Sequence, residues 1–291
     1  MSHKVIVFGE MLWDCLPSGD VPGGAPMNVA LHLHQLGKNT QLISAVGTDE
    51  RGEKLIQFYK QYGASDALIQ LKSEQETSRV LVDKTDPENI KYTILSPVAW
   101  DYIDLTPENK EAVRSSDAFV FGTLSVRNTH SLKSLLALLH EAEFRVFDAN
   151  LRPPFYDFEV IETLLAYTDV LKINEDELEA FGDYFNTKAD PLSLCQFLDT
   201  HFPVDLICIT LGSKGAMIYQ KGKIINHPGY KIQVEDSIGA GDAFLSGFVK
   251  TYLDGQSIAE VLDFSCKLGA FVATQKGGTP RYQLEDLSKI N

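Results

Sequence analysis

The sequence predicts an α/β fold, a doubly wound and mainly parallel sheet flanked by helices. The first indication is a set of short, mostly apolar runs typical of strands buried on both faces, at residues 5–8, 118–121, 144–147 and 169–174. The second is that helical patterns separate these runs at the spacing of βαβ units. The third is the lack of a Pro-, Gly- or Ser-rich linker, from which we expect one domain over residues 1–291.

The composition excludes several classes of protein. A net charge of -14 leaves no overall basic surface for nucleic acid or anionic membranes, and no apolar run approaches the ~20 residues that span a bilayer. The N-terminus runs directly into the first strand without a signal-peptide cleavage pattern. The cysteines have no paired spacing, so neither disulfides nor a zinc site is indicated, and we expect a cytoplasmic protein. They are Cys15, Cys195, Cys208 and Cys266.

Polar residues follow the first strand and open the first helix. Asp14 comes shortly after that strand, and ligands of open parallel sheets gather at the carboxyl ends of strands. Gly23 and Gly24 permit a ligand to approach the backbone closely. Asn28 offers a donor and an acceptor in a helix that continues to Leu36. A turn aspartate and an Asn-capped, glycine-rich turn are the alternative explanations.

The later strands also end in polar residues, which we expect at the same edge of the sheet. Asn150 and Arg152 follow the third strand. Arg152 either binds a phosphate or hydroxyl group of a ligand or lies on the surface beside the acidic residues 157–162. Asn174 and Glu177 are three residues apart at a helix start, which predicts a capping box.

Two further segments connect strands. Residues 77–82 and 90–95 alternate in polarity around a turn at residues 86–89, which predicts a β-hairpin inserted between βα units. Residues 206–210 predict a strand, and the glycine-containing loop 211–215 after it is compatible with a simple β-turn. This loop lacks the residue order of a Walker phosphate loop.

The most informative stretch is residues 236–248. An alternating run at residues 230–234 predicts a strand before it, and the small residues 239–241 lead into a buried helix. Backbone N–H groups at such a helix start favour an anion. Asp242 is either a first-turn acid that complements the helix dipole or a carboxylate that accepts a proton beside a phosphoryl group. A second helix is predicted over residues 257–273.

Two strings resemble the signatures of the pfkB (ribokinase-like) family of carbohydrate kinases. They are Gly-Gly-Ala-x-x-Asn-x-Ala-x-x-Leu-x-x-Leu-Gly at residues 23–37 and Asp-Ser-x-Gly-Ala-Gly-Asp-Ala-Phe at residues 236–244. The resemblance implies a ribokinase-like fold whose small β-lid is built from about residues 12–22 and 77–103. It also implies ATP-dependent transfer of the γ-phosphoryl group to a primary hydroxyl of a free sugar. In some members the lid strands clasp a second subunit, so a homodimer is one implied assembly.

The resemblance also implies a role for individual residues. Asp242 would be the catalytic base, assisted by Arg152 and by an anion hole made of Gly239, Ala240 and Gly241. The implied sugar-binding residues are Asp14, Gly23, Gly24, Asn28, Asn150, Arg152 and Asp242. The implied nucleotide-binding residues are Asn174, Thr210, Gly212, Ser213, Lys214, Gly215, Gly241, Cys266 and Ala270.

The same resemblance implies binding sites for metal ions. Asn174 and Glu177 would organise Mg²⁺ through its waters, a role compatible with the capping box. Many family members bind a monovalent cation beside the anion hole. The matched K⁺ positions are Asp236, Ile238, Val272, Gln275 and Gly277. The last family ligand position falls on Arg281, itself a cation.

The sugar is indicated by finer similarities. Gly-Glu-Met-Leu-Trp-Asp at residues 9–14 and Asp-x-Asn-Leu-Arg at residues 148–152 are most similar to bacterial fructokinases, which makes fructose the first choice. Ribose, another free sugar or a nucleoside is the alternative substrate. A non-catalytic sugar sensor on the same fold is a further alternative. A dinucleotide-dependent dehydrogenase is disfavoured because no Gly-x-Gly-x-x-Gly follows the first strand.

Overall fold

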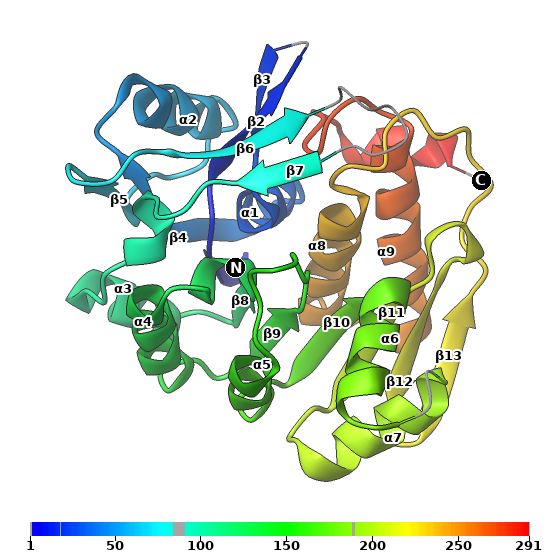
Figure 1. The fold of residues 1–291 in the computed structure, drawn as a ribbon. Helices are drawn as coiled ribbons and strands as arrows, with labels where there is room; N and C mark the ends of the chain where they lie inside the picture. Colours follow the sequence, from blue (N-terminus) through cyan, green and yellow to red (C-terminus); the bar gives the residue numbers. More distant parts are fainter. Residues whose placement is uncertain (1, 18, 84–90, 188–189, 291) are drawn as a thin grey trace.

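A computed structural model describes residues 2–17, 19–83, 91–187 and 190–290. In this part of the chain, nine strands form the main sheet, in the order β13-β12-β11-β10-β9-β8-β1-β4-β5 (Figure 1). Their bounds are β1 (Lys4–Phe8), β4 (Asn39–Gly47), β5 (Ile69–Lys72), β8 (Ala118–Gly122), β9 (Arg145–Asp148), β10 (Val170–Asn174), β11 (Leu206–Thr210), β12 (Ala216–Gln220) and β13 (Lys223–His227).

The main sheet is mostly parallel. Neighbouring strands from β5 to β11 pair in parallel, whereas β12 and β13 are joined by antiparallel pairing. The prediction of a doubly wound, mainly parallel sheet is therefore confirmed. Because parallel strands end at one edge, Phe8, Gly122, Asp148, Asn174 and Thr210 all reach the same edge of the sheet.

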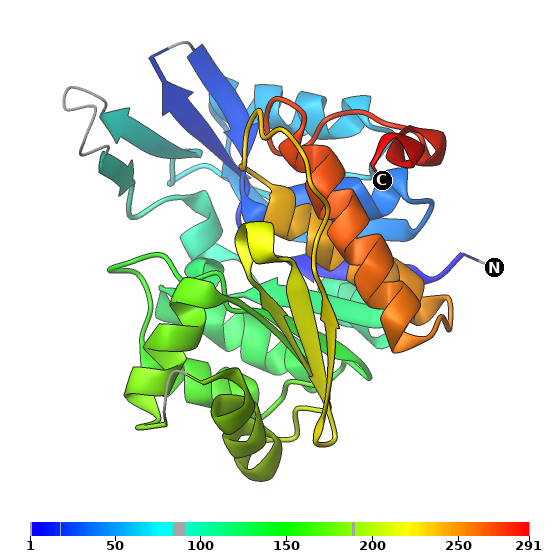
Figure 2. The same cartoon turned by 90° about the vertical axis from the view of Figure 1, so that its right-hand side faces the viewer.

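Helices cover both faces of this sheet, which lies between them in the side view (Figure 2). Helices α1, α2, α8 and α9 share one core with the strands, and α3 to α7 share the other. Their bounds are α1 (Ala25–Gln35), α2 (Glu50–Gln61), α3 (Pro107–Arg114), α4 (Thr129–Leu139), α5 (Phe158–Leu165), α6 (Glu175–Tyr184), α7 (Pro191–His201), α8 (Ala240–Leu253) and α9 (Ile258–Ala273). Short 3₁₀ segments are η1 (Ala99–Tyr102), η2 (Leu124–Val126), η3 (Gly212–Lys214) and η4 (Leu284–Lys289).

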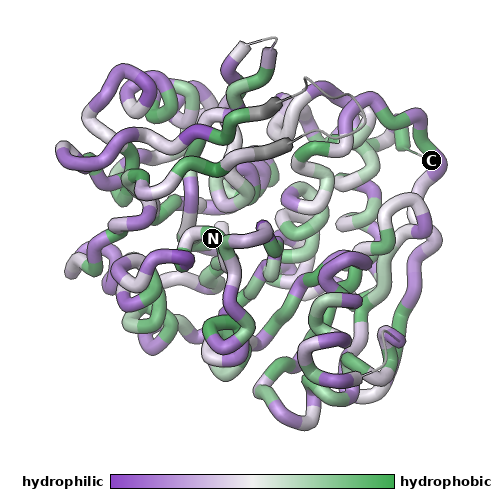
Figure 3. The backbone as a smooth tube through the Cα atoms, viewed as in Figure 1, coloured by the Kyte–Doolittle hydropathy of each residue, from purple (hydrophilic) through white to green (hydrophobic). Residues whose placement is uncertain are grey.

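The continuous apolar runs of the central strands follow from burial on both faces. In β8, Ala118 and Val120 pack into the core that contains α8, whereas Phe119 and Phe121 pack into the opposite core. Hydrophobic residues accordingly concentrate along the strands in the middle of the molecule (Figure 3). Across the described ranges, no helix combines the length and the apolar character needed to span a bilayer.

A second, smaller sheet projects from the main body (Figures 1 and 2). Within the described residues it has four strands in the order β3-β2-β6-β7. Their bounds are β2 (Leu12–Leu16), β3 (Gly19–Gly23), β6 (Ser78–Asp83) and β7 (Lys91–Ile94). The antiparallel pairing of β6 with β7 agrees with the predicted hairpin, while its predicted turn at residues 86–89 lies outside the described residues.

One predicted element was wrong. Residues 230–234 form no strand; β13 is the strand before the 236–248 stretch, and it ends at His227. Tyr230 and Ile232 pack against the small core formed with α9 and η4, which produces an alternating pattern without a partner strand. Helix α1 begins at Ala25 with a proline in its first turn, so Asn28 lies in that turn as predicted, and Gly24 rather than Asn28 is the N-cap residue.

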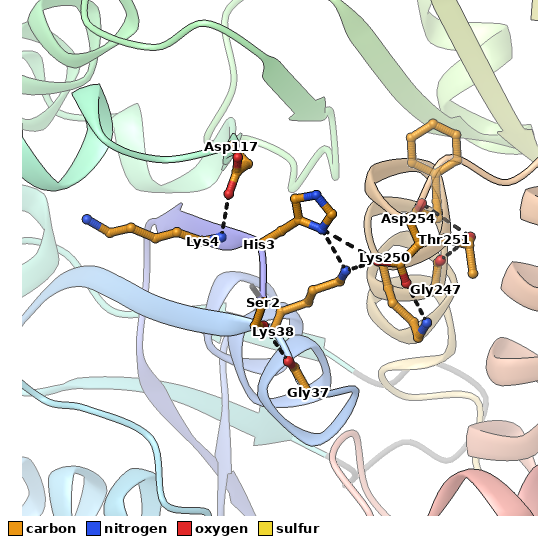
Figure 4. Close-up of polar contacts among 11 residues, drawn as sticks. Ser2, His3, Lys4, Gly37, Lys38, Asp117, Gly247, Lys250, Thr251 and Asp254 are labelled. Carbon is orange, nitrogen blue, oxygen red and sulfur yellow. Dashed lines mark hydrogen bonds and ion pairs between the residues drawn. The ribbon is translucent and has the colours of Figure 1, made fainter.

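A polar network on another side of the fold joins the N-terminal segment to the ends of α1 and α8 (Figure 4). The Lys38 amine contacts the Asp254 carboxylate and lies 3.2 Å from Nδ1 of His3. Asp254 also accepts a hydrogen bond from Lys250 at 2.7 Å. Burial raises the pKa of Asp254, but the bonds from Lys250 and Lys38 outweigh it and lower that pKa to about 2.

Candidate active site

The centre of the candidate site is a contact between two helix starts. Helix α1 begins after Gly24, and α8 begins after Gly239. In the first turn of α1, Asn28 donates a hydrogen bond from Nδ2 to Oδ2 of Asp242 in the first turn of α8, over 2.8 Å. A hydrogen bond between two side chains therefore connects the two signature strings, which lie far apart in the sequence.

Residues 239–241, which we call the anion turn, have a backbone that only glycine permits at its start. Gly239 has a φ of 75°, and a Cβ there would lie 2.4 Å from the carbonyl oxygen of Gly278. The first N–H groups of α8 have no partner within the helix, and the helix dipole favours an anion at this end. The turn is therefore shaped to approach a negatively charged group through its backbone.

The carboxyl group of Asp242 is easier to protonate than an ordinary aspartic acid. Desolvation by the surrounding protein raises its pKa, and the negative charge of Asp148 raises it further, to about 6. The hydrogen bond from Asn28 and the positive charges of Lys172 and Arg152 act in the opposite direction. A carboxylate with this pKa is poised to accept a proton near neutral pH.

Lys172 and Asp148 are site residues that the sequence analysis missed. They face each other in the register of β10 and β9, and the Lys172 amine lies 2.9 Å from Oδ1 of Asp148, with both side chains buried. Burial lowers the pKa of Lys172, but the charges of Asp148 and Glu177 outweigh it and raise that pKa. A Cβ on Gly241 would lie 3.4 Å from the Lys172 amine, so a fixed positive charge adjoins the anion turn. The signal for Lys172 was a lone charge inside an apolar strand.

Glu10 is a second acid that the sequence analysis did not select. It lies two residues after the end of β1 and is 3% exposed, and burial raises its pKa to about 7. With Thr123, Asp148 and Asn150 it lines a cavity of about 20 Å³, enough for one water molecule. An acid at the end of an otherwise apolar run was the signal that could have identified it.

The predicted sugar-binding residues lie around the same strand ends. Gly23 faces Asp14, because a Cβ on Gly23 would lie 2.4 Å from Oδ2 of Asp14. Burial raises the pKa of Asp14, and the charge of Arg152 opposes that change. Asn150 has a φ of 40°, an uncommon conformation for a residue other than glycine. Arg152 is exposed, and its Nη1 donates to the Leu151 carbonyl at 3.1 Å.

Apart from Asn174 and Gly241, the predicted nucleotide-binding residues come from the end of β11, the loop after it and α9. Thr210 ends β11, and the loop after it contains η3 instead of a simple β-turn. Lys214 in this loop is exposed and lies 2.5 Å from the Glu175 carboxylate. Cys266 and Ala270 lie four residues apart on α9 and so share one face of that helix. Cys266 is buried, and burial raises the pKa of its thiol to about 12.

The capping box predicted at the start of α6 is confirmed. Asn174 Oδ1 accepts from the backbone N–H of Glu177, and Glu177 Oε2 accepts from the backbone N–H of Asn174. The other carboxylate oxygen of Glu177 accepts from the Leu151 N–H at 2.8 Å. Among the described residues, no group of three or more His, Cys, Asp or Glu side chains is arranged to hold a metal ion.

The segments matched to a K⁺ site are in contact with each other. Asp236 accepts hydrogen bonds from the N–H groups of Ile238 at 3.0 Å and Gly277 at 3.1 Å. Arg281, which takes the last ligand position, donates to the Gln61 carbonyl at 2.8 Å, and its guanidinium carbon lies 4.7 Å from the centre of the Tyr62 ring. Its charge is therefore held against the end of α2.

The doubly wound sheet and the polar residues at its carboxyl edge define a ligand-binding protein of ribokinase-like fold. Two crystal structures align over nearly the whole chain: fructokinase from Xylella fastidiosa with bound ATP, and a fructokinase double mutant from Vibrio cholerae O395 in fructose, ADP and potassium ion bound form. For the first, the TM-score is 0.86 at 22% identity, covering 99% of this chain and 98% of that one. For the second, it is 0.85 at 23% identity, covering 99% and 97%.

Sequence comparison gives the family. Residues 19–283 match the pfkB family carbohydrate kinase pattern, and this chain belongs to that family. Fructokinase-2 of Solanum lycopersicum is 28% identical over 309 residues, which cover 96% of this chain and 93% of that protein. The protein is a carbohydrate kinase, as the two signature strings predicted.

Proposed function

We propose that this carbohydrate kinase transfers the γ-phosphoryl group of ATP to a primary hydroxyl of a free sugar, with fructose as the first choice. The observation that carries the proposal is Asp242 in the first turn of α8, bonded by Asn28 and next to the anion turn. A proton acceptor beside a cradle for negative charge is the pair of groups that phosphoryl transfer to a hydroxyl requires.

In this mechanism Asp242 accepts the proton of the sugar hydroxyl while the hydroxyl oxygen attacks the γ-phosphorus. The bond from the γ-phosphorus to the oxygen that bridges it to the β-phosphate breaks, and ADP leaves. The bond from Asn28 to Oδ2 of Asp242 holds the carboxylate in place. Oδ1 of Asn28 is buried, and among the described residues it has no hydrogen-bond partner. A buried acceptor without a partner is costly, so a hydroxyl donated by the sugar fits this position.

The charge that spreads over the phosphoryl oxygens needs several donors. The N–H groups of the anion turn and the Lys172 amine supply them, and Arg152 adds a further positive charge from its exposed loop. Asn174 and Glu177 would suit an outer shell of acceptors for Mg²⁺. The backbone N–H groups hold their oxygens in place, each oxygen keeps a second lone pair for a water, and this ion keeps many of its waters. When bound, Mg²⁺ would neutralise phosphate charge.

The sugar would lie between Asp242 and the second sheet. Asp14, Gly23 and Gly24 belong to β2, β3 and the turn after them, and Asp14 is a partly buried carboxylate that can accept from sugar hydroxyls. We assign the described residues of the second sheet, which falls in the predicted ranges of about 12–22 and 77–103, as a lid whose closure would exclude water and limit ATP hydrolysis. The named fructokinase relatives support fructose among the free sugars.

The nucleotide would extend from the anion turn towards α9. Its phosphates would meet the loop at residues 212–215, and its adenine would meet the face of α9 that carries Cys266 and Ala270. K⁺ would be held between Asp236 and the residues after α9, mainly through backbone carbonyls. The contact of Asp236 with Gly277 supports this location, and Arg281 is engaged elsewhere.

The test is ATP consumption with Mg²⁺ across free sugars and nucleosides, with Asp242→Asn in parallel. We expect fast phosphorylation of fructose and a loss of at least ~10²-fold in kcat for the variant, with sugar binding retained. Strong activity on another sugar alone would replace the substrate and keep the mechanism. Near-wild-type turnover by Asp242→Asn would refute the assignment of the base, and no turnover on any substrate would favour a sensor.

A further inference from the structure

His32 is a fully buried side chain close to the candidate site, with no role in the mechanism above. It lies one helical turn after Asn28 in α1, so both side chains share one face of the helix. Its Nε2 lies 2.9 Å from the carbonyl oxygen of Gly278, and its Nδ1 lies 3.1 Å from the Tyr282 hydroxyl. Its ring also stacks on that of Tyr282.

These contacts define the hydrogen positions of the imidazole. A carbonyl oxygen only accepts, so Nε2 of His32 carries the hydrogen, and Nδ1 accepts from the Tyr282 hydroxyl. Burial lowers the pKa of His32 to about 4, so the ring is neutral near neutral pH. His32 is therefore a fixed donor to one backbone carbonyl.

The backbone of Gly278 touches both parts of the candidate site. A Cβ on Gly239 would lie 2.4 Å from the Gly278 oxygen and 2.5 Å from its Cα, so the two backbones are in close contact. A Cβ on Gly278 would lie 3.0 Å from Nδ2 of Asn28, the atom that donates to Asp242. The carbonyl that His32 holds thus belongs to the residue that backs both the anion turn and the Asn28 amide.

Other side chains also donate hydrogen bonds to the segment around Gly278, and these bonds can be compared with the bond from His32. The Tyr62 hydroxyl donates to the Thr279 carbonyl at 2.6 Å, and Gln35 Nε2 donates to the Pro280 carbonyl at 3.3 Å. These bonds hold the neighbouring residues of the same segment. The bond from His32 is the one made to the residue in contact with Gly239 and Asn28.

We propose that His32 is a positioning residue for phosphoryl transfer, acting through the Gly278 carbonyl on the anion turn and on Asn28. This inference rests on the proposed function of that site. Without the donor, the Gly278 carbonyl lacks its partner and its peptide plane is free to turn. Gly239 and the Asn28 amide then lose a fixed neighbour, and the reacting groups are held less accurately.

The experiment compares His32→Phe, which keeps a ring but removes the donor, with His32→Gln, whose amide can donate to Gly278. We expect kcat per folded molecule to fall about ten- to a hundredfold in His32→Phe, with KM for ATP and sugar within about threefold of wild type. The His32→Gln variant should recover most of that loss. Tyr62→Phe is the matched control, since it removes the donor to the next carbonyl, and its kcat should stay within about twofold.

A second measurement does not depend on turnover. Backbone hydrogen exchange at residues 237–243 should be faster in His32→Phe than in Tyr62→Phe. Each variant is measured at the same number of degrees below its own melting temperature. Equal effects of the two variants on kcat or on this exchange would overturn the inference, because His32 would then only stabilise the fold. If the larger ring prevents folding, His32→Leu takes its place. If the wild type phosphorylates no sugar, the proposed function fails, and the exchange comparison still decides the role of His32.

Discussion

Gly239→Ala tests whether the shape of the anion turn matters for catalysis separately from stability. Gly239 and Gly255 have the same φ of 75°, so alanine at either position meets the same backbone strain, about 1–2 kcal/mol. Their surroundings differ. A Cβ on Gly239 would lie 2.4 Å from the Gly278 oxygen, whereas a Cβ on Gly255 would meet no atom within 4 Å.

The two variants should therefore separate strain from displacement. Gly255→Ala should lose about 1–2 kcal/mol of unfolding free energy in urea, and Gly239→Ala should lose more, because its Cβ also clashes with the Gly278 backbone. In Gly239→Ala the clash must also shift the anion turn away from Gly278, and misplaced donors in such a site lower turnover by ~10²-fold. Gly255→Ala, at the far end of α8, should keep kcat within about twofold of wild type.

The assay is ADP release at saturating ATP and sugar, scaled to the folded fraction of each variant. Wild-type kcat in Gly239→Ala, together with the expected loss of stability, would refute the reasoning, because the turn would then tolerate a shift that the contact with Gly278 imposes. A loss of kcat of similar size in Gly255→Ala would refute it as well, since strain alone would then account for the effect.

Two further predictions concern pH. The pKa of Asp242 is raised to about 6, and a general base acts in its deprotonated form. The value of kcat/KM should therefore be constant above about pH 7 and fall tenfold per pH unit well below pH 6. A profile that stays flat down to pH 5 would contradict this prediction. The pKa of Asp254 is lowered to about 2, so its ion pairs with Lys38 and Lys250 stabilise the fold above about pH 4 and are lost as pH falls towards 2. Asp254→Asn should cost about 1 kcal/mol in urea unfolding at pH 7, a value reduced for solvent screening, and much less near pH 2.5; an equal cost at both pH values would contradict it.

The sequence predicted the main sheet well because a strand buried on both faces can be recognised from its own residues. Each central strand is apolar throughout, since both of its faces are buried, as in Phe119 and Val120 of β8. Asn28 and Asp242 were selected because each lies in a glycine-bounded helix start. The wrong strand at residues 230–234 shows the limit of such reasoning, because alternation records packing and does not report whether a partner strand exists.

The sequence analysis missed Lys172 and Asp148 because their proximity depends on the register between two strands. Lys172 appears in the sequence as one charge in an apolar strand, and Asp148 as an acid at a strand end. Their pairing follows from the parallel alignment of β10 with β9, which the sequence does not specify. His32 is similar, because its partners Gly278 and Tyr282 come from the far end of the chain.

The charges of the site explain how Asp242, the proposed base, can lie next to the anion turn. Asp148 raises the pKa of Asp242, which favours proton transfer but would also repel phosphate. Lys172 neutralises Asp148 directly, and its amine also adjoins Gly241, so the charge that pairs with the acid faces the place where an anion would bind. Removing Lys172 would therefore leave a buried carboxylate unpaired and the anion turn less positive at once. Stability and anion binding are coupled here through one side chain.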